Sequence, residues 1–166
     1  TMVGHSDGGC SEDAARGFAF IDVCQQTFDV IVMNPPFGDF TPRFKPFARD
    51  LYPNSYNDIF AAFTECCSKL LRPGGILGAI TSRTGFFLTT FEPWRDRFLL
   101  AQHNLRLLAD LGEGVMDEAM VEAAAYCLRA SPTSQPFPVV RLLGVPDRGA
   151  ALLEAVLVFE PRLIEL

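Results

Sequence analysis

The chain has 166 residues, of which 49% are hydrophobic and 20% are charged, and its formal net charge is −6. This size and composition indicate one globular domain with a buried core and exclude a disordered chain. The negative charge argues against tight nucleic-acid binding by the chain alone, because phosphate neutralisation needs clustered Lys and Arg. No apolar run approaches the roughly 20 residues of a membrane span, so we expect no membrane contact.

The chain has five cysteines, two histidines and no C-x-x-C spacing. This pattern argues against a disulfide framework and against a zinc site, so we expect no metal ligands and a cytoplasmic location. Cys66 and Cys67 are interpreted as buried thiols within a helix. Residues 1–16 are polar and glycine-rich and are expected to be a mobile lead-in. Both ends of the sequence resemble cuts in a longer chain.

The first predicted element is an apolar strand over residues 28–33, whose β-branched side chains suit a parallel strand covered on both faces. It must end at Pro35 and Pro36, because proline lacks a backbone donor and restricts the residue before it. A long loop over residues 37–54 follows, and loops of this length are usually functional or mobile. The clearest helix is expected over residues 55–71.

In that helix, Ser55 and Asp58 have the spacing of a capping box, with Asp at the position that Glu or Gln usually holds. The segment 72–75 is expected to end the helix, with glycine as a left-handed cap. The later predicted elements are strand 76–81, loop 81–90, helix 91–100 with Thr90 as its cap, strand 105–111, a strand in the second half of 121–130, loop 131–138, strand 139–145 and helix 149–159. This alternation predicts an α/β fold with a mostly parallel sheet, flanking helices and right-handed connections.

The tetrapeptide Asn34-Pro35-Pro36-Phe37 follows the first strand, at the edge where open α/β sheets bind ligands. The side-chain carbonyl of Asn34 and the backbone carbonyl of Pro35 are two acceptors, and the proline rings fix the direction of the second. Together they can hold both hydrogens of a planar NH2 group and free its lone pair to attack an electrophilic methyl group. Phe37 offers a face for a heteroaromatic ring, worth about 1–3 kcal/mol. The alternative is that the tetrapeptide only ends the strand as a turn.

Residues 28–38 resemble the catalytic motif of class I amino-methyltransferases. Four downstream segments resemble adenine-specific DNA methyltransferases of restriction-modification and phage-exclusion (BREX) systems: 57–63, 70–77, 110–115 and 121–124. The resemblance covers roughly residues 20–128 and implies a Rossmann-like class I methyltransferase fold that uses S-adenosyl-L-methionine. It also implies methyl transfer to the exocyclic amine of a flipped adenine in DNA, because that atom is shielded within a duplex.

The resemblance assigns roles to individual residues. It implies that Asn34 and Pro35 bind the adenine amine and that Phe37 stacks on the base. It implies that Pro36 shapes the wall between base and cofactor, and that Asn34 and Pro36 also contact S-adenosyl-L-methionine. Asp22 falls where the family places an acidic residue near the adenine of the cofactor; a solvated loop aspartate is the alternative.

One feature of the family has no match in this chain. The glycine-rich cofactor loop should follow a first strand, but the glycines near the N-terminus lack one, and Gly112 and Gly114 come too late. We therefore expect residues 17–145 to be the catalytic half of a methyltransferase domain that lacks its first cofactor-binding half. Residues 146–166 are expected to be a truncated helical extension. A permuted order, with the missing half after Leu166, is the alternative.

Other functions remain open at this point. Guanine-N2 methylation of ribosomal RNA and glutamine-N5 methylation of a protein use the same tetrapeptide, and a non-catalytic truncated module is a third possibility. The isolated chain is expected to be inactive and to contact DNA only through the full-length protein. Its open sheet edge is expected to favour self-association. Arg83 is interpreted as a solvated loop residue, with phosphate contact as the alternative.

Overall fold

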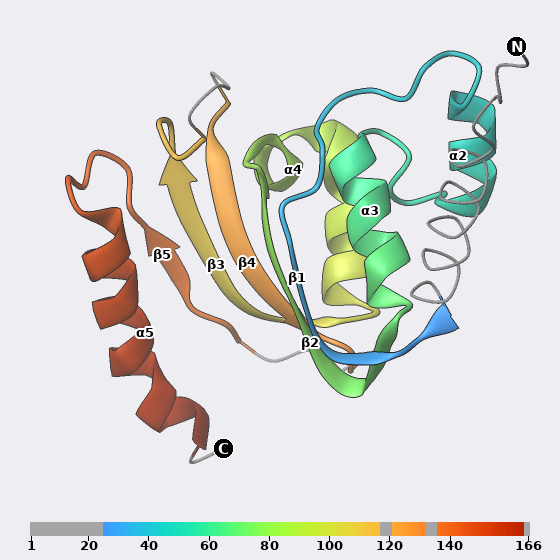
Figure 1. Ribbon diagram of the computed structural model, residues 1–166. Helices are drawn as coiled ribbons and strands as arrows, with labels where there is room; N and C mark the ends of the chain where they lie inside the picture. Colours follow the sequence, from blue (N-terminus) through green and yellow to red (C-terminus); the bar gives the residue numbers. More distant parts are fainter. Residues whose placement is uncertain (1–24, 117–120, 132–135, 165–166) are drawn as a thin grey trace, which may run out of the picture.

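The computed structural model describes residues 25–116, 121–131 and 136–164. Five strands form one sheet in the order β1-β2-β4-β3-β5 (Figure 1). Their bounds are β1 Phe28–Met33, β2 Leu71–Ser82, β3 Asn104–Gly112, β4 Ala123–Arg129 and β5 Val139–Arg141. β1 is parallel to β2 and β3 is parallel to β5, whereas β4 is antiparallel to both of its neighbours. The expected α/β fold with a mostly parallel sheet is confirmed, because every strand except β4 runs in the same direction.

The reversal of β4 departs from the expected parallel connections. The link between β3 and β4 covers only residues 113–122. A parallel crossover needs a dozen or more residues, so a shorter link returns the chain in the opposite direction. In the ambiguous apolar segment 121–130 the strand runs from Ala123 to Arg129, so it begins before the second half, where it was expected.

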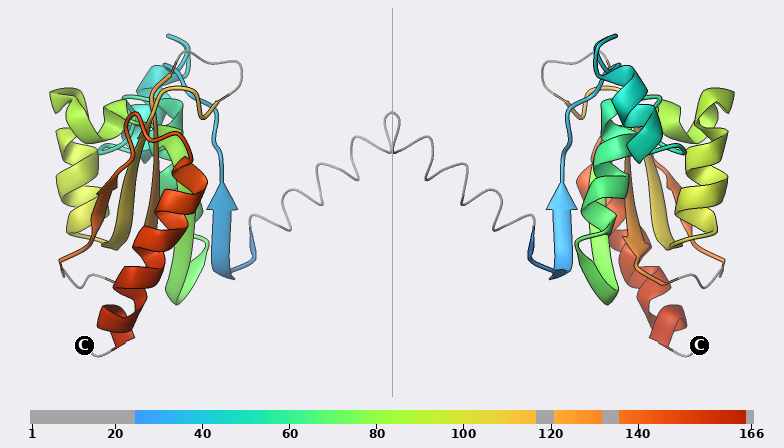
Figure 2. Two further views of the ribbon diagram at one scale, coloured as in Figure 1. Left: turned by 90° about the vertical axis from the view of Figure 1, so that its left-hand side faces the viewer. Right: turned by 90° about the vertical axis from the view of Figure 1, so that its right-hand side faces the viewer.

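Helices cover the two faces of the sheet unequally. The helical segments are α2 Lys45–Leu51, α3 Ile59–Ser68, α4 Thr84–Phe87, the 3-10 turn η1 Thr89–Phe91, the π-helix η2 Trp94–Leu100 and α5 Arg148–Ile164. Figure 2 shows α3 and η2 on one side of the sheet and α5 on the other. None of the described helices is long and apolar enough to cross a membrane.

The larger core lies between the sheet and α3 and is rich in aromatic rings. Phe60 of α3 stacks on Phe91 at 5.4 Å between ring centroids and meets Trp94 edge to face at 5.6 Å. Tyr126 of β4 reaches the same cluster, and its buried hydroxyl lies 2.9 Å from Thr64 Oγ1. These contacts fix α3 against β2 and β4, and α3 in turn positions the loop that follows β1.

Several predicted element boundaries are wrong, including both ends of the first long helix, and a side-chain contact explains where that helix begins. The helix begins at Ile59 with Asp58 as its cap, because the Ser55 hydroxyl donates instead to Glu65 at 2.5 Å. It ends at Ser68, and β2 already begins at Leu71. The glycine expected as a helix cap therefore lies inside a strand.

The remaining boundary differences concern loops and ends. The loop expected over 37–54 contains α2, whose first turn accepts Pro46 because no intrahelical donor is needed there. The helix expected over 91–100 starts as a 3-10 turn and continues as a π-helix from Trp94, so Thr90 does not cap it. β5 is shorter and α5 is longer than expected. The lead-in expected over residues 1–16 lies outside the described residues.

β1 is the edge strand of the sheet, and one of its faces is open. Ile31 and Met33 pack against the core on the α3 side. Val30 and Val32 point the other way and are 61% and 81% exposed. The expectation that this strand is covered on both faces therefore fails for the described part of the chain, where α5 lies over the other end of the sheet, against residues of β3 and β4.

Candidate functional site

The tetrapeptide lies at the carboxyl end of β1, where the sequence placed it. Asn34 and Pro36 are exposed, whereas Pro35 between them is buried. Burial of Pro35 and the following Pro36, which restricts ψ of the residue before it, hold the Pro35 backbone carbonyl in one direction. Phe37 is half-buried and meets Phe60 edge to face at 6.4 Å between centroids. The structure thus supplies one freely accessible side-chain acceptor beside a rigid backbone; the roles of these residues toward an amine and a cofactor remain predictions.

The loop after the tetrapeptide is tied to the start of α3. The backbone N–H of Gly38 donates to Asp58 Oδ1 at 3.0 Å, and the N–H of Ile59 donates to the Gly38 carbonyl at 2.9 Å. The same Asp58 oxygen accepts from the Phe60 N–H at 3.1 Å, as a helix cap does. Gly38 has a φ of +119°, which disfavours any residue with a side chain. Asp58 therefore connects the candidate clamp to the core.

Replacing Asp58 tests this connection. Asp58→Ala removes an acceptor for two backbone donors, and we expect it to lower the free energy of unfolding by about 1–2 kcal/mol. Asp58→Asn keeps an acceptor oxygen, and we expect it to stay within about 0.5 kcal/mol of the wild type. Urea unfolding of the three proteins measures both differences. Equal losses in Ala and Asn variants would show that the carboxylate charge, and not the acceptor, holds the loop.

The stability difference between the wild type and Asp58→Asn should also depend on pH. Burial raises the pKa of the Asp58 carboxyl above its usual value, although hydrogen bonds from Phe60 and Gly38 oppose the shift. Because the pKa is higher in the folded than in the unfolded chain, this group favours folding below its unfolded pKa. That contribution is lost as the pH rises through the folded pKa. Asp58→Asn should remove this part of the pH dependence of stability, which unfolding at a series of acidic pH values measures.

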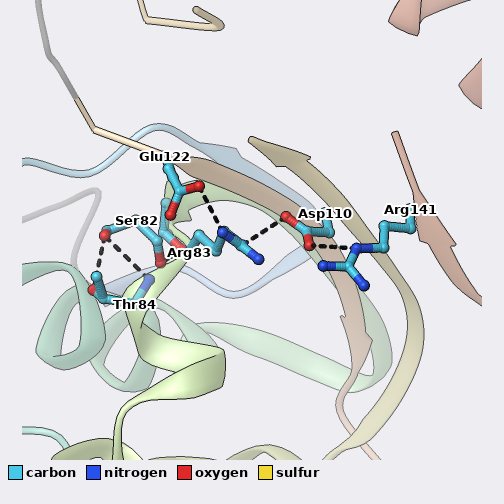
Figure 3. A network of polar contacts seen from close by, with 7 residues as sticks. Ser82, Arg83, Thr84, Asp110, Glu122 and Arg141 are labelled. Carbon is cyan, nitrogen blue, oxygen red and sulfur yellow. Dashed lines mark hydrogen bonds and ion pairs between the residues drawn. The ribbon is translucent and has the colours of Figure 1, made fainter. Parts of the chain in front are cut away.

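An ion-pair network occupies the same edge of the sheet, at the ends of β2 and β3 (Figure 3). Arg83 follows β2, and its Nε lies 2.9 Å from Asp110 Oδ1 while its Nη1 lies 2.6 Å from Glu122 Oε1. The side chains of Arg83 and Asp110 are only 16% and 6% exposed. The interpretation of Arg83 as a solvated loop residue is therefore wrong. Its charge is balanced by two carboxylates.

The network joins strand ends at the edge of the sheet that also carries the candidate clamp. Arg141 of β5 approaches Asp110 from the other side, with 3.7 Å between Nε and Oδ2. The Arg83 guanidinium also lies over the Phe87 ring, 4.4 Å from its centroid. Since β1, β2, β3 and β5 run in one direction, their carboxyl ends share one edge. Sequence reasoning missed this network because its members are distant in the chain and each alone resembles a surface charge.

An apolar cavity borders Asn34 on the α5 side of the sheet. Its volume is about 400 Å³. Its lining is mostly apolar and comes from β1, β2, β3, β4 and α5, including Val32, Gly78, Ala125 and Leu152. The open face of β1 therefore continues into a hollow beside the candidate clamp.

The predicted cofactor contacts are only partly represented in the described residues. Asn34 and Pro36 are exposed and can contact a ligand, whereas Asp22 lies outside the described residues. No group of three His, Cys, Asp or Glu side chains that could hold a metal ion occurs in the described part of the chain. The described residues therefore include the predicted target-amine site and only a small part of the predicted cofactor site.

Two curated relatives resemble this chain. It is 27% identical over 117 residues to "Adenine-specific methyltransferase BrxX" of Escherichia coli O9:H4 (strain HS), which is 64% of this chain. It is 30% identical over 108 residues to "Adenine-specific methyltransferase PglX" of Lacticaseibacillus casei (strain Zhang), or 61% of this chain. The matched region spans 9% of the length of each relative.

A solved structure shares the fold. A protein from Listeria monocytogenes, described as a class I S-adenosylmethionine-dependent methyltransferase, superimposes with a TM-score of 0.61 over 81% of this chain and 42% of its own. The two sequences are 16% identical, so this likeness shows the class I methyltransferase fold. The sequence profile described as "Eco57I restriction-modification methylase" matches residues 8–115, which is more than half of the chain. The chain therefore belongs to the Eco57I restriction-modification methylase family.

Proposed function

We propose that this chain carries the target-amine clamp of an S-adenosylmethionine-dependent DNA adenine-N6 methyltransferase and acts as part of a longer protein. The observation that carries the proposal is the placement of Asn34 and Pro35 at the carboxyl end of β1. One is an exposed amide and the other is buried with a fixed carbonyl. The family match and the names of the two curated relatives support the choice of adenine and of restriction-modification or phage defence.

The chain's own residues perform the binding and orientation. Asn34 Oδ1 and the Pro35 carbonyl accept one hydrogen each from the target NH2 group. Holding both hydrogens out of the ring plane favours tetrahedral character at nitrogen and makes its lone pair available. S-adenosyl-L-methionine supplies an electrophilic methyl group when bound. No strong base is needed, because the nitrogen loses its proton only after methylation has made it cationic.

Phe37 and the open edge fit a base delivered out of a duplex. A duplex shields the exocyclic amine of adenine, so the base must be extruded to reach the clamp. Phe37 is half-buried, so one part of its ring packs in the core and the rest is available for stacking. Guanine-N2 of RNA and glutamine-N5 of a protein present the same NH2 geometry and are the alternative substrates. The family match disfavours them.

Methyl transfer from labelled S-adenosyl-L-methionine tests the proposal. The protein that contains this chain is incubated separately with DNA, ribosomal RNA and a protein extract. We expect label in DNA that depends on Asn34. Label confined to RNA or protein would overturn the DNA assignment, and no label in any of the three would overturn the methyltransferase assignment.

The 166 residues alone should bind the cofactor very weakly. β1 is a sheet edge with Val30 and Val32 exposed on its open face, as expected where the rest of a methyltransferase domain packs. Only Asn34 and Pro36 among the described residues are proposed to contact the cofactor. We expect calorimetry to detect no binding of S-adenosyl-L-methionine below about 1 mM, where the binding free energy is about −4 kcal/mol. A micromolar dissociation constant would contradict this division of the domain.

Two further parts of the proposal concern the surroundings of the chain. The open edge of β1 can pair with another copy, so the isolated chain is expected to self-associate. A DNA-modifying enzyme with free thiols at Cys66 and Cys127 is expected in the cytoplasm.

A further inference from the structure

The clamp depends on which way the Asn34 side-chain amide faces. Its oxygen accepts hydrogen bonds, whereas its nitrogen donates two. A target amine finds an acceptor only if Oδ1 is turned toward it. If the Asn34 amide were rotated by half a turn, its N–H donors would face the N–H donors of the target amine. Because Asn34 is exposed, the bare strand end does not choose between the two orientations. A neighbour must engage Nδ2.

Met116 supplies that neighbour. Asn34 Nδ2 lies 3.9 Å from Met116 Sδ, within the range of a weak hydrogen bond to sulfur. A thioether sulfur accepts but cannot donate, so it favours the nitrogen end of the amide over the oxygen end. Met116 is 82 residues away in sequence, in the short segment that follows β3. This contact is therefore a tertiary one.

Met116 comes shortly after the end of β3 at Gly112. Asp110 lies in the last part of that strand, and its carboxylate is held by Arg83 and Arg141. Gly112 turns the chain with a φ of +69°, and a Cβ there would lie only 2.5 Å from Leu143 Cδ2. Met116 is half-buried and packs against the smaller core cluster beneath β3 and β4. Its sulfur is thus presented to Asn34 by the same edge of the sheet that carries the ion-pair network.

We propose that Met116 is a positioning residue that turns the Asn34 amide so that Oδ1 faces the target amine. The inference rests on the proposed function, because it concerns the same clamp. It acts through Asn34 and requires no contact between Met116 and the substrate. It therefore predicts an effect on the rate of methyl transfer with little effect on substrate affinity.

Two substitutions of similar size separate an acceptor from a packing role. Met116→Leu keeps the apolar volume and removes the acceptor, whereas Met116→Glu keeps, when ionised, an acceptor that cannot donate on an unbranched side chain. In the full-length protein we expect Met116→Leu to lower kcat about three- to tenfold, the effect of losing one weak hydrogen bond, with KM for DNA unchanged. We expect Met116→Glu to restore kcat to within about twofold of the wild type.

Steady-state kinetics of the wild type and the two variants show whether Met116 acts as an acceptor or only packs. Wild-type kcat in Met116→Leu, or equal losses in the Leu and Glu variants, would overturn the inference and leave the proposed function intact. If the wild type methylates only RNA or protein, the DNA assignment fails. The kcat values of the Met116 variants relative to the wild type, measured on that substrate, then test the role of Met116. If the wild type methylates none of them, the proposed function and the inference both fall.

Discussion

Asn34→Ala is expected to reduce methyl transfer by about 10²–10³-fold or more, the cost of removing one preorganised group that stabilises a transition state. The alanine leaves the Pro35 carbonyl as the single acceptor of the proposed clamp. One acceptor cannot hold both hydrogens of the target amine out of plane, so the nitrogen lone pair stays conjugated with the ring. Initial rates with labelled S-adenosyl-L-methionine and DNA measure the loss.

A matched control separates the clamp from a general effect of losing an amide. Gln102 is an exposed amide outside the candidate site, just before β3 begins. Gln102→Ala should keep the wild-type rate. Because Asn34 is exposed and its Nδ2 makes only a long contact to Met116, Asn34→Ala should also leave the free energy of unfolding within about 0.5 kcal/mol. Wild-type turnover in Asn34→Ala would refute the clamp.

Asp110→Ala is expected to destabilise the chain by about 3 kcal/mol, because removing one partner of a buried ion pair leaves a buried charge uncompensated. Of its two carboxylate partners, Arg83 would keep Glu122, whose side chain is 45% exposed, and it would still lie over the Phe87 ring. The ends of β2 and β3 would then lose their connection at the candidate site. Trp94 is the single tryptophan and is fully buried, so its fluorescence during urea unfolding measures the loss.

Arg141→Ala is the control for Asp110→Ala. The Arg141 side chain is 69% exposed and its Nε lies 3.7 Å from Asp110 Oδ2. Because the Arg141 side chain is exposed and the contact is long, we expect this pair to contribute no more than a surface pair does, up to about 1 kcal/mol. Similar small losses in both variants would mean that the Arg83–Asp110 pair adds little to stability.

The sequence was sufficient for the first strand and for the position of the tetrapeptide at its end, because both depend on neighbouring residues. An apolar run stopped by Pro35 and Pro36 has few alternatives, and the acceptors that follow are fixed by covalent structure. The class of the fold followed from the alternation of strands and helices. The cap of α3 was harder, because the capping-box spacing placed the start of the helix at Ser55, whereas Asp58 caps it. The Ser55 hydroxyl instead donates to Glu65, which lies ten residues further along the chain.

The rest of the site depends on contacts that sequence spacing does not reveal. Arg83, Asp110 and Glu122 come from three different strand ends, and only the sheet order brings them together. The reversal of β4 places Glu122 beside Arg83. The contact between Met116 and Asn34 arises in the same way, from the return of the chain after β3.

The identity of the methylated nucleoside tests most directly whether the protein methylates adenine-N6 in DNA by means of Asn34. DNA is incubated with labelled S-adenosyl-L-methionine and either the wild-type protein that contains this chain or its Asn34→Ala variant, and then digested to nucleosides. We expect label in N6-methyladenine with the wild type and background label with Asn34→Ala. Equal labelling by the two proteins, or label from the wild type in a different nucleoside, would contradict it.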